Sequence, residues 1–327
     1  METQTHASEM PLAGVPKGRF APSPSGRMHL GNLFTALVSW LSVKSRGGKW
    51  VLRIEDLDRQ RSREEYAMQI EDDLLWLGLE WDEGGLENIG DAGPYCQSMR
   101  DEIYADALRS IGDRGLLYPC RCRRADILAT QAPHQSDGRV VYAGTCRPSE
   151  RPPFLKTDVD NSAAALRLYV PDENICFTDL VFGKQSINLA RHCGDFVMRR
   201  ADGAWAYQLA VVVDDALMGV TEVVRGCDLL ISTAQQIYLY SLLGYNTPEF
   251  MHLPLICNYL GQRLSKRDAM MDVGTLRKNF TAREVLGRLA YMARLIPEPV
   301  PIGFGDLIPE FSIERIPAVG RVIGEEV

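Results

Sequence analysis

Residues 19–32 read RFAPSPSGRMHLGN and predict a strand, a tight loop and the start of a helix. Pro22 and Pro24 fix their own φ angles and cannot donate a ladder hydrogen bond, while Gly26 lacks a Cβ, so the strand should end in a proline-stiffened loop. Apolar residues then recur at helical spacing, at Leu30, Leu33, Phe34, Leu37, Val38 and Leu41. Because a helix that begins here directs its free N–H groups and its positive dipole end at the loop, we expect a phosphate-type anion site there, with His29 at the helix N-terminus.

The helix start resembles the first signature sequence of the class I aminoacyl-tRNA synthetases, which stands here as His29-Leu30-Gly31-Asn32. The residues before it are similar to the glutamyl branch of that class; the four residues alone could also be an ordinary helix start. The resemblance implies that His29 is catalytic, stabilising charge on the α-phosphate while a carboxylate attacks ATP. His29, Gly31 and Asn32 are the expected ATP-binding residues in this part of the chain. The generic signature ends in His where this chain has Asn32, so no second imidazole is expected.

The resemblance also implies where glutamate binds. Glutamate-binding residues are expected in the strand and loop before the signature, at Arg19, Phe20, Ala21, Pro22 and Ser23. Segments 206–215 and 219–230 are close to the corresponding glutamyl-family segment and add Tyr207 and Arg225. A planar guanidinium suits a bidentate contact with a carboxylate. On periodicity alone, Arg225 could equally be an exposed charge at the end of a strand.

A cluster of carboxylates, Glu55-Asp56-Leu57-Asp58, follows the next predicted strand, at 50–54. In open α/β sheets ligands bind at the C-terminal edge of the strands, so these carboxylates lie where a binding site is expected. The alternative is a solvated turn before the next helix. The resemblance places Glu55 on the α-ammonium group of the substrate and leaves Asp56 and Asp58 without a role.

Three cysteines have the spacing of a metal site: Cys120 and Cys122 stand one residue apart, and Cys146 follows after a loop. Their thiolates can hold one tetrahedral Zn²⁺, and either Tyr142 or the chemically commoner His134 could be the fourth ligand. Three free thiols are the alternative. The resemblance to a shortened branch of the glutamyl family, which glutamylates queuosine in tRNA(Asp), implies a structural zinc held by Cys120, Cys122, Tyr142 and Cys146. Nearby basic residues would be a solvated surface or a phosphate-binding patch: Arg121, Arg123, Arg124, Arg139 and Arg147.

A second signature follows the predicted strand at 250–257. Residues 261–267, GQRLSKR, resemble the second class I signature, in which a mobile Lys and a serine hydroxyl hold the leaving pyrophosphate. Ser265 and Lys266 are accordingly expected to be ATP-binding, and Lys266 to be catalytic. Arg263 and Arg267 depart from the generic Lys and Ser.

Composition is that of a soluble globular protein, with 46% hydrophobic and 24% charged residues among 327. The sequence contains no apolar run of about 18 residues, which excludes a membrane span. A net charge of −7 argues against a protein that wraps nucleic acid with its whole surface, but not against a local basic face. Residues 1–16 lack the apolar core of a signal peptide, and eight cysteines without an export signal indicate reduced thiols or a metal site. We expect a cytoplasmic location.

The predicted fold class is α/β, a Rossmann-like parallel sheet of a class I synthetase with an inserted zinc-containing subdomain of the acceptor-binding type and a short helical C-terminal region. The resemblance covers roughly residues 17–295. The expected divisions are an extension at 1–16, a first catalytic half at 17–95, an insertion at 96–200, a second catalytic half at 201–257 and a C-terminal region at 258–327. Thr281 and Glu284 form a predicted capping box for the last clear helix, and the chain ends about thirty residues after it, without the large helical anticodon-binding region of a full glutamyl-tRNA synthetase.

The resemblance implies an enzyme that activates L-glutamate with Mg²⁺-ATP without needing tRNA. It would then transfer glutamate to the cyclopentene diol of queuosine at the first anticodon position of tRNA(Asp), acting as a monomer. Two alternatives stay open: a truncated glutamyl-tRNA synthetase that charges tRNA(Glu), and a zinc-bearing RNA-binding relative without catalysis. His29, Lys266 and Arg225 argue against the second alternative.

Overall fold

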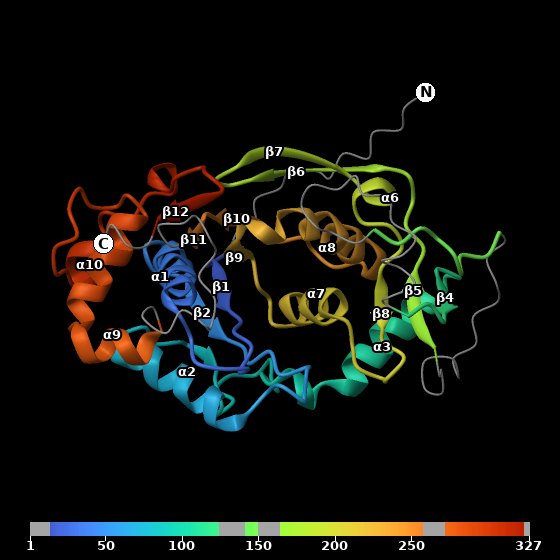
Figure 1. Ribbon diagram of the computed structural model, residues 1–327, viewed down its shortest axis with the longest axis horizontal. Helices are drawn as coiled ribbons and strands as arrows, with labels where there is room; N and C mark the ends of the chain where they lie inside the picture. The colour runs from blue at the N-terminus through green and yellow to red at the C-terminus, as the bar shows by residue number, and fades with distance from the viewer. Residues whose placement is uncertain (1–13, 124–140, 150–163, 258–271, 324–327) are drawn as a thin grey trace.

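The computed structural model describes residues 14–123, 141–149, 164–257 and 272–323, which build an α/β fold around one central sheet (Figure 1). Neighbouring strands of this sheet are parallel, except for an antiparallel hairpin of β6 and β7 at one edge. Within the described residues the strand order is β3 (Glu83–Gly84), β2 (Lys49–Leu52), β1 (Lys17–Phe20), β9 (Glu222–Gly226), β10 (Glu249–Leu253), β6 (Asn174–Asp179) and β7 (Gly183–Asn188). The prediction of a Rossmann-like, mostly parallel sheet is confirmed.

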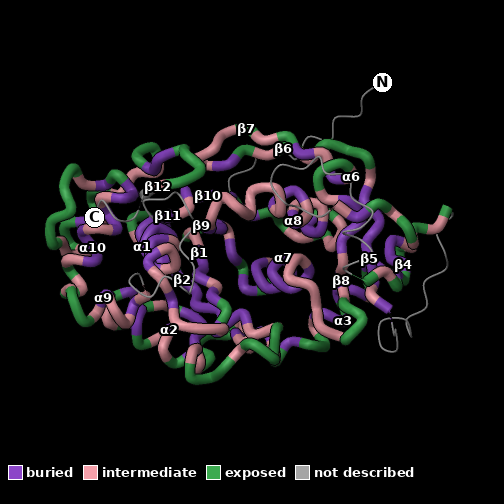
Figure 2. The backbone as a smooth tube through the Cα atoms, in the orientation of Figure 1, coloured by how far each residue is buried: buried purple, intermediate pink, exposed green. Residues whose placement is uncertain are grey.

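The central strands are covered on both faces, because successive side chains of a strand point to opposite sides of the sheet. In β2, Trp50 and Leu52 join one core while Val51 joins the other. The first core contains residues of α1 (Leu30–Lys44), α2 (Glu64–Leu77), α9 (Val273–Asn279) and α10 (Ala282–Met292). The second contains residues of α3 (Asp101–Gly112), α7 (Tyr207–Leu217) and α8 (Leu230–Leu243). Figure 2 shows the central elements mostly buried and the exposed residues mainly along the outer loops.

The sheet reverses its winding between β1 and β9. From β1 the chain passes through α1 to β2 on one side, and from β9 it passes through η2 (Cys227–Leu229) and α8 to β10 on the other. Gly18 of β1 is in register with Glu222 of β9, and the two strands are parallel, so their C-terminal ends lie side by side. Such a reversal opens a crevice beyond the strand ends, where ligands bind in open α/β sheets.

A smaller antiparallel sheet contains β4 (Leu117–Cys120), β5 (Ala165–Leu168) and β8 (Val197–Arg199), at the right of Figure 1. The short helix α6 (Leu189–His192) precedes β8. The β6–β7 hairpin stands between β5 and α6 in the chain, yet Asp179 of β6 pairs with Phe250 of β10. By its hydrogen bonds the hairpin therefore belongs to the central sheet, although it falls within the predicted insertion at 96–200. The division of the chain into domains stays a prediction.

The segment after α10 packs back onto the molecule. It contains α11 (Phe304–Leu307), η4 (Ile313–Arg315) and β12 (Arg321–Ile323), and β12 pairs with β11 (Leu255–Cys257). The ring of Phe304 lies 4.5 Å from that of Trp40 in α1, between ring centroids. α10 begins at the predicted capping box of Thr281 and Glu284.

The short helix η1 (Gln97–Met99) leads into α3. Among the described residues, no helix combines the length and the apolar character needed to cross a membrane.

Candidate active site

A pocket of about 370 Å³ opens at the C-terminal ends of β1, β9 and β10. It collects residues from the chain segments that the sequence singled out, which are separated by up to about two hundred positions. The predicted site residues that line it are Arg19, Phe20, Ala21, Pro22, Ser23, His29, Gly31, Asn32, Glu55, Tyr207 and Arg225. The predicted site residues Ser265 and Lys266, and the alternative metal ligand His134, lie outside the described residues.

His29 begins α1 and faces the pocket. Its Nδ1 accepts a hydrogen bond from the Gly31 amide at 3.1 Å, and the Asn32 side chain accepts one from the His29 amide at 3.0 Å. These two bonds form a capping box in which Asn32 takes the place that Glu or Gln usually has. Since Nδ1 is an acceptor, the neutral ring carries its proton on Nε2. The departure from the generic signature at Asn32 thus has a structural role, because it orients the His29 backbone.

Glu55 lies in a buried network of charges that the sequence did not reveal. Arg53 donates to Glu55 at 3.1 Å and to Asp215 at 2.6 Å, and Arg19 donates to Asp215 at 3.3 Å and to the Val224 carbonyl at 3.1 Å. Burial raises the pKa of Glu55, although Arg53 and Arg19 oppose this. Burial also acts to raise the pKa of Asp215, but Arg53 and Arg19 together lower it. The sequence indicated Arg19 and Glu55 through the resemblance, and otherwise only the pair Asp214-Asp215 in the apolar run 205–217.

The other aspartate of that pair, Asp214, ties α7 to α3. It accepts hydrogen bonds from Arg100 at 2.7 Å, from Gln97 at 2.7 Å and from the Tyr104 hydroxyl at 2.9 Å. Arg53 lies 3.7 Å away and completes the link to the pocket. All of these side chains are buried. Glu55 and Arg19 are therefore held by a rigid layer of paired charges beneath the pocket.

Arg225 has a different environment, because its partners are neutral. Its Nε donates to His252 Nε2 at 3.1 Å, and its terminal nitrogens donate to Gln236 Oε1 and Thr233 Oγ1 at 2.7 Å each. The guanidinium also lies over the ring of Phe250, 5.3 Å from the centroid. Burial lowers the pKa of Arg225. Its hydrogen-bond partners among the described residues include no carboxylate, and two of its five N–H groups are left for a ligand.

Tyr207 begins α7 and lines the same pocket as Glu55 and Arg225. Burial raises the pKa of its phenol, and the Glu55 carboxylate adds to the effect while Arg225 opposes it. The phenol therefore stays neutral and can donate one hydrogen bond. Pocket residues that the sequence did not indicate come mainly from the ends of β9 and β10: Ser25, Thr35, Val224, Gly226, Asp228, Leu229, Pro254, Leu255 and Ile256.

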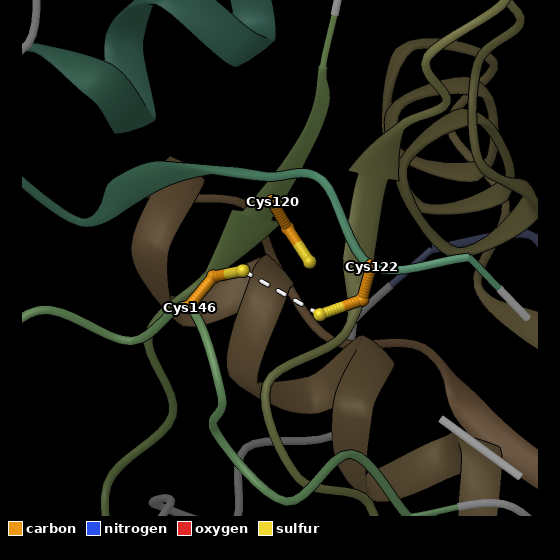
Figure 3. A group of neighbouring side chains, drawn as sticks. All are labelled: Cys120, Cys122 and Cys146. Atoms are coloured by element: carbon orange, nitrogen blue, oxygen red, sulfur yellow. Dashed lines mark hydrogen bonds between the residues drawn. The ribbon is translucent and has the colours of Figure 1, made fainter. Parts of the chain in front are cut away.

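The predicted metal ligands meet at the end of β4, away from this pocket. Figure 3 shows the sulfur atoms of Cys120, at the end of β4, and of Cys122 and Cys146, in the segments that follow, converging on one point, and all three lie within 4.8 Å of one another. Cys122 Sγ lies 3.5 Å from Cys146 Sγ, and the Tyr142 oxygen lies 3.5 Å from Cys120 Sγ and 3.8 Å from Cys122 Sγ. The Arg121 amide lowers the pKa of the Cys146 thiol to about 7. Burial raises the pKa of Tyr142, so its phenol stays protonated without a metal.

Basic residues around this cluster have partners of their own. Arg147 donates to the buried Asp195 at 3.1 Å and to the Val170 carbonyl at 3.2 Å, which fixes it to the small sheet. Arg167 lies over the Tyr142 ring, 3.8 Å from the centroid. Arg121 and Arg123 are exposed, while Arg124 and Arg139 lie outside the described residues. A basic patch at this place stays a prediction.

Comparison with known proteins gives concordant matches. The family described as "tRNA synthetases class I (E and Q), catalytic domain" matches residues 17–295. The chain is 50% identical to the glutamyl-Q tRNA(Asp) synthetase of Symbiobacterium thermophilum, over 92% of this chain and 93% of that protein. It is 43% identical to the protein of the same name from Nitratidesulfovibrio vulgaris, again over 92% and 93%. The structure is similar to that of a glutamate tRNA ligase from Elizabethkingia meningosepticum in complex with its amino acid, with a TM-score of 0.79 and 28% identity over 96% of this chain and 68% of that one.

Proposed function

The chain belongs to the class I tRNA synthetases of the glutamyl and glutaminyl kind, and from this premise we propose that it joins L-glutamate to queuosine in tRNA(Asp) at the expense of ATP. In the first step the glutamate carboxylate attacks the α-phosphorus of ATP, giving a glutamyl adenylate and releasing pyrophosphate. In the second step a hydroxyl of the queuosine diol attacks the activated carbonyl, forming the ester and releasing AMP. The enzyme is a ligase.

This proposal is supported mainly by the two opposite charges that line the pocket, the carboxylate of Glu55 and the guanidinium of Arg225. Glu55 can bind the α-ammonium group of glutamate, whose positive charge would offset the burial that raises the pKa of Glu55. Arg225 lies elsewhere on the same pocket wall, with two N–H groups left for a carboxylate. A buried guanidinium without a charged partner favours an anionic ligand. The pair fits a small amino acid with an additional acidic group.

ATP is assigned to the other side of the pocket, at the N-terminus of α1. The N–H groups and the dipole of that helix favour phosphate, and His29 Nε2–H can stabilise charge on the α-phosphate. Gly31 leaves space beside the His29 ring, since a Cβ there would lie 3.0 Å from it. Class I synthetases use ATP with Mg²⁺, which neutralises part of the phosphate charge. Ser265 and Lys266 are proposed to hold the leaving pyrophosphate.

A structural zinc ion is proposed for the cluster of Cys120, Cys122, Cys146 and Tyr142. With Zn–S near 2.3 Å and Zn–O near 2.0 Å, the edges of a tetrahedron are about 3.8 Å between two sulfurs and about 3.5 Å between sulfur and oxygen. The separations of 3.5–3.8 Å found here fit these edges. Four protein ligands leave no open position, so the ion would hold the small sheet together and take no part in the chemistry.

Two experiments test the proposed function. Glutamate-dependent exchange between ATP and pyrophosphate should occur without tRNA. Radiolabelled glutamate should then transfer to tRNA(Asp) that contains queuosine and not to the same tRNA made without it. Efficient charging of tRNA(Glu) without labelling that depends on queuosine would instead establish a truncated glutamyl-tRNA synthetase, and exchange at background would favour a non-catalytic RNA-binding protein.

The acceptor tRNA, the oligomeric state and the location are part of the same proposal. We propose a monomer, because residues of one chain form the whole pocket wall described here. The tRNA acceptor and ATP are cytoplasmic substrates, so we propose a cytoplasmic enzyme. Size-exclusion chromatography with light scattering tests the first statement, and cell fractionation tests the second.

A further inference from the structure

His252 stands behind Arg225, outside the pocket wall. It lies in β10, directly beside Arg225 of β9 in the register of the sheet, and neither its backbone nor its ring is exposed. Its ring contacts two charged residues: Nε2 lies 3.1 Å from Arg225 Nε, and Nδ1 lies 2.6 Å from Asp179 Oδ2. Three residues from three neighbouring strands, β6, β10 and β9, thus form one hydrogen-bonded chain that ends at the pocket.

The hydrogen bonds determine the tautomer of His252. Arg225 Nε–H can only donate, so Nε2 of His252 must be the acceptor. The ring proton then lies on Nδ1 and is donated to the Asp179 carboxylate. Burial lowers the pKa of His252 more than the Asp179 bond raises it, which agrees with a neutral ring. The opposite tautomer would bring two N–H groups together and break the bond to Arg225.

Asp179 is itself fixed. Its Oδ1 accepts the amides of Phe182 at 2.8 Å and Val181 at 3.1 Å in the turn between β6 and β7, and its Oδ2 accepts the His252 amide at 3.1 Å. Burial acts to raise the pKa of Asp179, but the bond from the His252 ring, together with the Phe182 and Val181 amides, lowers it. The carboxylate is therefore charged and immobile, and it offers His252 a strong acceptor in one direction.

Arg225 has two further anchors, which are neutral. Gln236 is held in turn by Gln208, with 2.8 Å between Gln236 Nε2 and Gln208 Oε1, and Thr233 lies on α8. Only His252 connects Arg225 to a buried carboxylate among the described residues, and it does so without neutralising Arg225 directly. The guanidinium keeps a full positive charge for the ligand while its plane is fixed.

We propose that Asp179 and His252 are positioning residues that orient Arg225 for a carboxylate of the amino acid substrate. This rests on the proposed function, in which Arg225 binds glutamate. The effect should appear in the affinity for glutamate, because neither residue lines the pocket or contacts the phosphate side. A hydrogen bond to a charged group is typically worth enough to change binding roughly tenfold to hundredfold.

Two substitutions of His252 separate its bond to Asp179 from its contacts at Nε2, which include Thr233 Oγ1 at 3.2 Å as well as Arg225. The Asn amide reaches about as far as Nδ1, so His252→Asn keeps a donor for Asp179 and loses the acceptor for Arg225. The Gln amide reaches about as far as Nε2, so His252→Gln keeps the acceptor. In glutamate-dependent ATP–pyrophosphate exchange, the His252→Asn variant should have a KM for glutamate roughly tenfold to hundredfold above that of the wild type, with kcat and the KM for ATP little changed. The His252→Gln variant should have a KM for glutamate much closer to that of the wild type. Cys176→Ser, on an exposed position of the same strand as Asp179, is the control and should match the wild type.

A merely structural role predicts a different result. Both variants would then lose thermal stability and activity in parallel, or leave KM unchanged, and either outcome overturns the proposal. Long-range ¹H–¹⁵N NMR spectra of the free protein provide a readout independent of activity, with His252 assigned by its absence from the variants. The proton should be on Nδ1; a proton on Nε2 overturns the proposal.

Calorimetric titration with glutamate distinguishes this proposal from the function on which it rests. A wild type that binds glutamate but exchanges no pyrophosphate contradicts the proposed function, and weaker binding by His252→Asn than by His252→Gln would still support the positioning role. A wild type that binds no glutamate overturns both. An active wild type with equal glutamate affinity in the two variants overturns the positioning role alone.

Discussion

Single residues in the pocket differ in how their charge is compensated. Arg53 lies between Glu55 and Asp215, and Arg19 also contacts Asp215, so these charges balance beneath the pocket. Arg225 contacts neutral groups only, among the residues described. The Arg225 guanidinium loses its hydration when the protein folds, which costs free energy. Other interactions in the fold must offset this cost unless an anionic ligand neutralises the charge. Substrate binding and the stability of the pocket should therefore be coupled.

Arg225→Lys should raise the KM for glutamate by about a hundredfold, because an ammonium group cannot form the planar fork and also bond to His252 and Thr233. The measurement is the glutamate dependence of ATP–pyrophosphate exchange. Arg63→Lys, at an exposed position before α2, is the matched control and should leave KM unchanged. An unchanged KM in Arg225→Lys would contradict the assignment of Arg225 to the substrate carboxylate.

His252 should make the fold less stable in mild acid. The charged groups near its ring are Asp179 on β6, Arg225 on β9 and Asp228 in η2, and the net effect with burial is a pKa below the ordinary value of 6.5. The folded state therefore binds fewer protons than the unfolded state below that pH. The stabilising contribution is present above about pH 6.5 and is lost as the pH falls, by at most about 1.4 kcal/mol per pH unit.

Urea unfolding of the wild type and of His252→Gln, each at about pH 7.5 and about pH 5.5, measures this contribution. Groups common to both proteins cancel in the comparison. The wild type should lose more free energy of unfolding than the variant does, and equal losses would show that His252 is not held neutral in the fold.

At the scale of secondary-structure elements, the small sheet of β4, β5 and β8 is held together by side-chain contacts as well as by a few backbone hydrogen bonds. β4, β5 and β8 have three or four residues each, and few strand hydrogen bonds hold them together. Buried aromatic and ionic contacts add to these, such as the 2.6 Å bond from Tyr118 to Asp195. A metal ion at the end of β4 would join this sheet to the segment that carries Cys146.

Removal of zinc should destabilise this sheet. The purified protein should hold about one Zn²⁺ per chain, and a chelator or Cys146→Ser should remove it and lower Tm by roughly 5 °C. Metal analysis measures the zinc content and calorimetry measures Tm. Cys176→Ser, which changes an exposed cysteine, is the control and should change neither the zinc content nor Tm. Loss of metal from His134→Ala but not from Tyr142→Phe would show that Tyr142 is not the fourth ligand.

Asp73 of α2 connects the loop before α1 to α9. It accepts two hydrogen bonds from Arg27, at 2.7 Å and 3.1 Å, and one from Arg277 at 2.9 Å, and its own side chain is fully buried. Asp73→Asn should cost about 2 kcal/mol of unfolding free energy, since two arginines lose a shared buried partner. Asp72→Asn, which changes the exposed partner of Arg277, should cost less than about 0.5 kcal/mol. Similar losses in the two variants would contradict a special role for the buried carboxylate.

At the scale of the whole molecule, the described residues on both sides of segment 258–271 lie close to the first signature sequence. β11 adds Leu255 and Ile256 to the pocket wall just before residues 258–271, and α9 follows them. The Val273 amide donates to the Met28 carbonyl at 3.0 Å, and Asp272 forms a bridge with His29. Both ends of the segment with Lys266 are thus anchored beside the helix start that carries His29.

Lys266→Ala should slow glutamate-dependent exchange by about a hundredfold to a thousandfold, because a positive charge that stabilises the leaving pyrophosphate is lost. The KM for glutamate should change little, since the amino acid is assigned to the opposite part of the pocket. Lys278→Ala, in α9 and away from the pocket wall, is the control. A normal rate in Lys266→Ala would remove this residue from the catalytic assignment.

Local patterns in the sequence were enough to predict the proline loop, the start of α1 at His29, the capping box at Thr281 and the parallel sheet. These features depend on residues within a few positions of one another, whose periodicity and capping chemistry are readable directly. The spacing of Cys120, Cys122, Tyr142 and Cys146 likewise predicted a cluster, and the structure brings these four side chains together. The resemblance to a family supplied the proposed roles of Glu55, Tyr207 and Arg225, which periodicity left open, and the structure places all three on one pocket wall.

Contacts between distant segments could not be predicted in this way. Arg53 and Asp215 are 162 positions apart, and Asp179 and His252 are 73 apart. A charged residue at the end of a strand has the same local pattern whether it is exposed or buried, so neither Arg53 nor His252 was distinguished. Their partners are selected by the order and register of β6, β10, β9, β1 and β2, which places side chains of neighbouring parallel strands beside one another. Long-range burial, and with it the balance of charges that leaves Arg225 without a carboxylate partner among the described residues, arises only when those strands pair.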